Sequence, residues 1–308
     1  MKGALKSIIL VTAIAAVLAS GPATAQDATG NLRYSITVTK FENQAGWHGQ
    51  WDIGDAWGTV LTDMLNQSGK FIVLGETDMR AAALDEQDFA ASGRTAGGAK
   101  APVTGQMTPA QILVKGAITH VQGDTGGADG GIRIKGFKVG GGGGKGEVNA
   151  TVYLIDSTTG QVVASTNVVG THKRKALGVG YNAGGWGAAF GGHANDNVGL
   201  AVQDACAQAV DFLTAQLPNI LWSGSVVMVK DGQVYVNRGS REGIGVGQTF
   251  SVGEVEVLRD PDTGEVLDES MSEIARLKVS QVKEKLSICD VVSGDVSRVA
   301  KGMTIHLD

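Results

Sequence analysis

The chain has 308 residues, of which 43% are hydrophobic, 5% are aromatic and 46 are glycine. This length and apolar fraction suffice for about two folded domains and exclude collagen and wholesale disorder. A formal net charge of -5 offers no positive surface to a phosphate backbone, so DNA and RNA are excluded as partners.

Residues 1–25 have the pattern of a secretory signal peptide. Lys2 and Lys6 precede an apolar stretch from Ile8 to Leu18, and small residues lead to a cleavage site after Ala25. The apolar stretch is too short for a finished transmembrane helix, so we expect cleavage and export, with an uncleaved membrane anchor as the alternative. No cysteine closely follows the stretch, so the pattern supplies no attachment residue for a lipoprotein lipid.

Residues 26–222 are predicted to form a domain in which strands and helices alternate. Apolar residues at every second position predict strands, and apolar residues three and four apart predict helices. Gly69 is expected to end the first helix, Thr77 to cap the second, and a linker of glycine, alanine and proline to follow. The predicted strands are 31–41, 71–74 and 112–121, and the predicted helices are 55–67, 77–84 and 198–217.

Glycines crowd the middle of the chain, where two long hairpins without helical periodicity are predicted. The first covers about 126–156, shifts its alternation near Gly136, and turns through the glycine run 140–144. A phase shift at a glycine indicates a β-bulge. Its outward-facing apolar set is predicted to be Ile132, Ile134, Val148, Ala150 and Val152.

The second predicted hairpin covers about 168–196. A strand that crosses a membrane needs about 9 to 11 residues with apolar side chains at alternate positions, and this segment meets both conditions. Four strands cannot close a barrel and open edges are not tolerated in lipid, so a membrane barrel requires several subunits. Soluble hairpins or flexible loops are the alternative. The predicted lipid-facing residues are Leu177, Val179, Tyr181, Trp186 and Phe190.

Residues 223–308 show short strands separated by turns about every ten residues, which predicts a small β-barrel or a sandwich. Asp260, Asp262 and Glu265 resemble part of a calcium-binding loop, but no glutamate follows at the twelfth position, so a hairpin turn is expected. The overall fold class is therefore α+β, with an α/β domain, two long hairpins and a small all-β domain.

No motif points to catalysis. The glycine run before Lys145 lacks the first glycine and the Ser/Thr of a phosphate-binding loop, and no two histidines have the spacing of a helical zinc site. Cys206 and Cys289 have no metal or redox spacing; Cys206 lies on a predicted core face, and pairing of the two stays open. We expect no enzyme activity, no cofactor and no metal.

Three of the five tryptophans, Trp47, Trp51 and Trp57, lie close together where a polar loop enters the first predicted helix. Clustered aromatics mark a binding or lining surface when they are exposed. Trp57 falls within the helix and fits the core equally well. The sequence therefore predicts a functional loop without deciding which tryptophans belong to it.

Several segments resemble, in order and spacing, the CsgG/HfaB family of curli and holdfast assembly proteins. They cover about residues 31–222. The C-terminal segments 232–239 and 243–250 resemble the C-terminal domain of FlgT flagellar ring proteins. The matching CsgG-like segments are 36–43, 63–74, 112–119, 150–165 and 201–213.

The resemblance implies a periplasmic domain that assembles into a homo-oligomeric ring, with two hairpins per subunit building an outer-membrane barrel that exports unfolded secreted subunits. It also implies that residues 46–52 form the pore constriction, with Trp47, His48 and Trp51 as its narrowing residues. These are not the residue types of the curli channel itself. The alternative function is a soluble periplasmic ring or scaffold protein of a cell-envelope or flagellar assembly.

Overall fold

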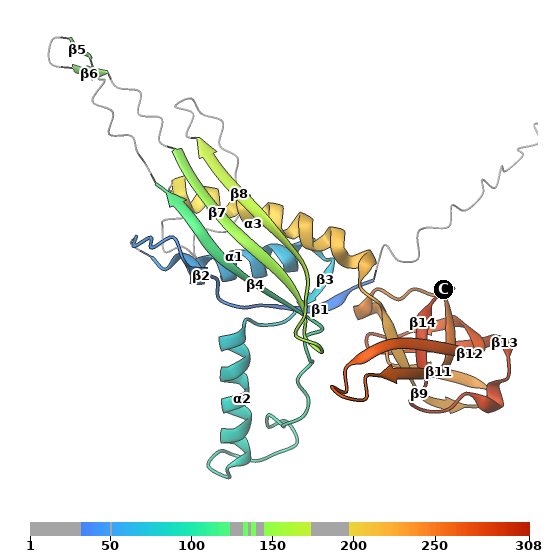
Figure 1. Ribbon diagram of the computed structural model, residues 1–308. Helices are drawn as coiled ribbons and strands as arrows, with labels where there is room; N and C mark the ends of the chain where they lie inside the picture. The colour runs from blue at the N-terminus through green and yellow to red at the C-terminus, as the bar shows by residue number, and fades with distance from the viewer. Residues whose placement is uncertain (1–31, 50, 124–131, 135–136, 140–144, 174–196) are drawn as a thin grey trace, which may run out of the picture.

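The computed structural model describes residues 32–49, 51–123, 132–134, 137–139, 145–173 and 197–308. The predicted signal peptide and all five predicted lipid-facing residues of the second hairpin, Leu177 to Phe190, lie outside these residues. The described chain forms a mixed α/β part followed by an antiparallel β-barrel (Figure 1).

The N-terminal part is built on a six-stranded sheet in the order β3-β1-β4-β7-β8, with the short strand β2 also paired to β4. Strand β1 runs parallel to both of its neighbours, whereas β7 runs antiparallel to β4 on one side and to β8 on the other. The strands are β1 (Tyr34–Val38), β2 (Glu42–Asn43), β3 (Phe71–Val73), β4 (Ile112–Gln122), β7 (Lys145–Asp156) and β8 (Val162–Lys173).

Two helices, α1 (Ile53–Ser68) and α3 (Asn197–Gln216), contact each other and pack on one face of this sheet (Figure 1). Gly69 ends α1 as predicted, because its φ of 63° lies in the left-handed region that glycine adopts readily. Helix α3 passes into a 3-10 turn, η4 (Leu217–Asn219), which contains Pro218. Among the residues that the structure describes, no helix is both long and apolar enough to cross a membrane.

Helix α2 (Thr77–Ala91) points away from the sheet and buries none of its residues (Figure 1). The prediction that Thr77 caps this helix is wrong, because Thr77 is already helical. The N-cap position belongs to Glu76, whose backbone is non-helical and whose side chain makes no capping hydrogen bond. The apolar pattern of this helix is therefore not explained by packing within the described chain.

The first predicted hairpin is wrong in two respects. Strand β5 (Ile132–Ile134) pairs with β6 (Phe137–Val139), so the chain reverses between them and the bulge expected near Gly136 does not describe this region. The residues expected to form the second strand of this hairpin form β7 instead, which pairs with β4 and β8 in the sheet. Three side chains expected to face outward are therefore buried in the protein core: Val148, Ala150 and Val152.

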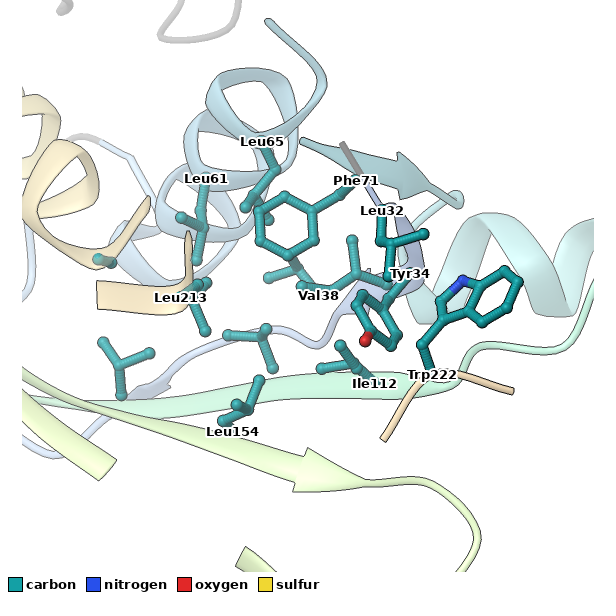
Figure 2. Packing of buried hydrophobic residues seen from close by; sticks show 14 of the residues in the cluster. Leu32, Tyr34, Val38, Leu61, Leu65, Phe71, Ile112, Leu154, Leu213 and Trp222 are labelled. Carbon is teal, nitrogen blue, oxygen red and sulfur yellow. The ribbon is translucent and has the colours of Figure 1, made fainter. Parts of the chain in front are cut away.

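The core lies between the sheet and the two packed helices, as Figure 2 shows for Leu61 and Leu65 of α1, Leu213 of α3 and Leu154 of β7. All four are buried, and a fully buried leucine stabilises a fold by about 1.5–3 kcal/mol. Cys206 of α3 is buried in this core as predicted, and burial raises the pKa of its thiol well above the ordinary value.

The C-terminal part is a closed barrel in the order β10-β13-β12-β11-β14-β9, so the barrel rather than the sandwich is correct. Cys289 is buried here, and both cysteines are free thiols. Asp260 Oδ1 accepts hydrogen bonds from the backbone N–H groups of Asp262 and Thr263, which is the predicted turn. The strands are β9 (Ser223–Lys230), β10 (Gln233–Val236), β11 (Thr249–Arg259), β12 (Val266–Val282), β13 (Ser287–Gly294) and β14 (Thr304–Leu307), with 3-10 turns η5 (Ser240–Glu242) and η6 (Val296–Arg298).

Candidate functional site: the tryptophan loop

The tryptophan loop, residues 44–52, connects β2 to α1 and is anchored at its start to the sheet. Strand β2 pairs in parallel with the second half of β4, and the Gln44 N–H donates to the carbonyl of Ile118 at 3.0 Å. The side chain of Asn43 then holds the loop, since its Nδ2 donates to the carbonyl of Trp47 at 2.8 Å. These contacts place the loop beside the end of β4 from which the glycine-rich region departs.

Trp47 and Trp51 form an aromatic pair in this loop. Their ring centroids lie 4.8 Å apart with the planes inclined by 59°, a tilted geometry that aromatic pairs favour. Both rings are half-buried and pack against the hydrophobic core. A Cβ at Gly49 would lie 1.9 Å from the Trp47 ring, so the ring occupies space that only glycine leaves free. The pair is therefore held in place rather than free in solvent.

The predicted site residues separate into two groups. His48 is exposed beside the half-buried Trp47 and Trp51, so the structure brings all three together on one loop. Trp57 is fully buried on α1 and stacks on Phe41, with ring centroids 5.1 Å apart. Trp57 therefore belongs to the core, and only the two loop tryptophans are available for a function at the surface.

Asp52 fixes the end of the loop where α1 begins. Its Oδ1 accepts hydrogen bonds from the backbone N–H groups of Gly54 at 2.8 Å and Asp55 at 3.0 Å, which caps the helix. Lys40 lies 3.0 Å from Asp52 and 2.7 Å from Asp55, and all three side chains are exposed. The hydrogen bond from the Asp55 backbone N–H lowers the pKa of Asp52, and the Lys40 ammonium lowers it further.

We expect Asp52→Ala to lower the free energy of unfolding by about 0.5–2 kcal/mol, because the substitution removes the α1 cap. The pKa of Asp52 is lower in the folded chain than its ordinary value of 3.8, so the capping contribution is complete above that pH and is lost as the pH falls through the folded pKa. Urea unfolding of both proteins at pH 7 and in acid measures this, and the difference should shrink in acid. Lys40→Met is the control: it removes only exposed ion pairs and should cost less.

Sequence reasoning missed the residues that hold the tryptophan loop. Asn43, Gly49 and Lys40 are polar or small, and their sequence positions give no sign that they contact the tryptophans or Asp52. Among the described residues, no group of three or more histidine, cysteine, aspartate or glutamate side chains is arranged to hold a metal ion. The described part of the loop is an aromatic surface with one exposed imidazole.

A protein-family model described as "Curli production assembly/transport component CsgG" matches residues 20–248. No curated protein sequence matches the chain. The match ends inside the barrel, so the predicted likeness of the C-terminal domain to FlgT stays a prediction.

Several solved bacterial structures are similar to part of this chain. The hypothetical protein CT253 from Chlamydia trachomatis is 12% identical, with a TM-score of 0.37 over 61% of this chain and 99% of that chain. The PelC dodecamer from Paraburkholderia phytofirmans is 19% identical, with a TM-score of 0.27 over 56% of this chain and 90% of that chain. The lipoprotein GNA1162 from Neisseria meningitidis is 16% identical, with a TM-score of 0.26 over 61% and 99%.

Proposed function

Because the chain belongs to the CsgG family of curli production assembly and transport components, we propose that it forms an oligomeric secretion channel in the outer membrane. Unfolded subunits of a curli-like or adhesive surface protein would leave the periplasm through the centre of a homo-oligomeric ring. Members of this family are non-enzymatic transport components. We therefore propose that transport through the channel is passive and needs no cofactor.

One observation supports the proposal most: both candidate membrane segments depart from the same end of the sheet. Segment 123–144 joins the end of β4 to the start of β7, and segment 174–196 follows the end of β8. Gln122 is in register with Glu147, and Lys145 with Lys173, so these ends lie side by side. Each segment is long enough for two strands of about 9 to 11 residues.

These two segments are shorter than the hairpins predicted from sequence at 126–156 and 168–196. The difference arises because β7 belongs to the sheet, and so do residues 168–173 at the end of β8. Two segments contribute four strands, which do not close a barrel by themselves. Lipid does not tolerate the two open edges that would remain. The proposal therefore requires several copies of the chain, each adding its four strands to one shared barrel.

The tryptophan loop supports a constriction next to this barrel. The loop leaves the sheet beside Ile118, close to the end of β4 where the first membrane segment begins. In a ring, every copy would present Trp47, His48 and Trp51 toward the same central opening. The mutual packing of the two tryptophans, and their contact with the core, would keep that opening narrow without metal or nucleotide.

The proposal is tested by single-channel conductance in planar bilayers. Replacing both Trp47 and Trp51 by alanine should raise the conductance clearly, because two large rings per subunit are removed from the narrowest point. Phe89→Ala is a matched control, since it removes an exposed aromatic ring from α2, outside the loop. A double variant with unchanged conductance would show that the loop does not form the constriction.

A soluble periplasmic scaffold is the second candidate, and one feature of the barrel favours it. Beyond Gly253, β11 has no partner other than β12, and together they form a two-stranded arm. The residues of this arm are exposed or half-exposed, and many are acidic. An arm of this kind suits contact with another protein of the envelope. The two candidates differ in whether the chain enters lipid, which the membrane extraction described in the Discussion measures.

A further inference from the structure

A pocket of about 330 Å³ lies between α1 and the start of α2, with a partly apolar lining from Val73, Leu74 and Met79. Thr59, Thr62, Asp63 and Asn66 of α1 line one side. Glu76, which immediately precedes α2, lines the other. The pocket thus combines two hydroxyls, one amide and two carboxylates in the gap between a packed helix and a projecting one.

Glu76 is the unusual member of this set. Its side chain is only 9% exposed, and its Oε1 is buried without a hydrogen-bond partner. The buried hydroxyl of Thr62 lies beside the Glu76 carboxylate and lowers its pKa, but it leaves Oε1 without a partner within hydrogen-bond distance. A Cβ at Gly58 would lie 3.0 Å from Glu76 Oε2, so the absence of a side chain there leaves room for the carboxylate against α1.

A buried carboxylate oxygen without a donor is costly, because it has lost its water and found no full replacement. The Thr62 and Thr59 hydroxyls beside the carboxylate offset only part of this cost, since burial raises the pKa of Glu76 while their hydrogen bonds lower it. Burial raises the pKa of Glu76, and the nearby Asp78 raises it further. No lysine or arginine lines the described pocket. The closest basic residue along α2, Arg80, is already engaged, since both of its terminal nitrogens donate to the carbonyl of Thr108 at 3.1 Å.

We propose that this pocket binds a cationic protein side chain, the ammonium group of a lysine or the guanidinium group of an arginine. Either group supplies the charged donor that Glu76 Oε1 lacks, and Asp63 and Asn66 offer further acceptors at the same pocket. Charge-assisted hydrogen bonds of this kind are shorter and stronger than neutral ones. The cation comes from a second copy of the chain or from another protein, and the chemistry is the same in both cases.

Butylammonium and methylguanidinium test the site directly as small probes. We expect either probe, at constant ionic strength and pH 8, to raise the melting temperature of the full chain to a plateau. Tetramethylammonium has the same charge but donates no hydrogen bond, and should have no such effect. Glu76→Gln should abolish the response and raise the melting temperature without probe, because a neutral amide is less costly to bury.

Two further variants keep the test specific. Asp85→Asn removes one exposed carboxylate from the same helix and should respond like the wild type. Glu76→Asp keeps the charge but withdraws it by one methylene, and should weaken the response. Equal responses in the wild type and in Glu76→Gln, or no response in the wild type, would overturn the proposal.

The source of the cation is then found by sedimentation across a range of concentrations. If Glu76→Gln weakens self-association while Asp85→Asn does not, the cation belongs to a second copy. If self-association is unchanged and the probe response holds, the cation belongs to a different protein. Neither result depends on whether the chain forms a channel, because the probe titration needs no membrane.

Discussion

A chain with lysine at Leu177, Val179 and Phe190 should be lost from the outer membrane. Each lysine on a lipid-facing position near the bilayer midplane costs about 2–4 kcal/mol, so three together cost about 6–12 kcal/mol, which is comparable to the whole stability of a folded chain. The proposed channel places these side chains against lipid. The measurement is fractionation with an alkaline carbonate wash, in which the wild type should stay in the washed membrane and the triple variant should appear in the wash.

The neighbouring residues of the same segment provide the control. Gly178 and Gly180 alternate with the lipid-facing positions, so they are expected to face the water-filled interior, where a lysine costs little. A chain with lysine at both glycines should remain in the washed membrane. If the wild type itself is released by the wash, the membrane assignment fails and the periplasmic scaffold is favoured.

Trp57→Ala should lower the free energy of unfolding of the N-terminal part by about 3–5 kcal/mol, the range for removing a large aromatic side chain from a core. Trp57 is among the largest of the fully buried side chains and stacks on Phe41. Its Nε1 makes no hydrogen bond, so the loss comes from packing alone. Urea unfolding followed by far-ultraviolet circular dichroism measures the change.

Two other variants separate the core tryptophan from the loop tryptophans. Trp57→Phe keeps a ring against Phe41 and removes the unpaired N–H group, so it should cost much less than alanine. Trp47→Ala removes a half-buried ring from the loop and should also cost less. A loss from Trp47→Ala as large as that from Trp57→Ala would contradict the division of the cluster into core and surface.

Much of the N-terminal fold follows from local pattern. The helix predicted at 55–67 is α1, and the helix predicted at 198–217 is α3 with its final 3-10 turn, because their apolar spacing reflects a face that is buried in the folded chain. Gly69 ends α1 through its own backbone preference. These features depend on residues a few positions apart, so a single sequence contains the information they need.

The candidate site was predicted only in outline. Clustering identified the tryptophan loop, but it did not decide that Trp57 of α1 is fully buried while Trp51 of the loop is only half-buried. The Glu76 pocket left no mark in the sequence, because it depends on Gly58 of α1 lying against a residue that precedes α2. A contact between two segments that are distant in the chain produces no periodic pattern of apolar residues, so sequence reasoning does not detect it.

Sequence alone determined helices α1 and α3, the main strands of the N-terminal sheet, and that residues 223–308 fold as strands and turns. Tertiary structure decided what covers each apolar face. An alternating strand shows that one side avoids water, but protein and lipid exclude water equally well. Val148, Ala150 and Val152 illustrate the difference: their alternation fits a membrane strand, yet the chain places them in its own core.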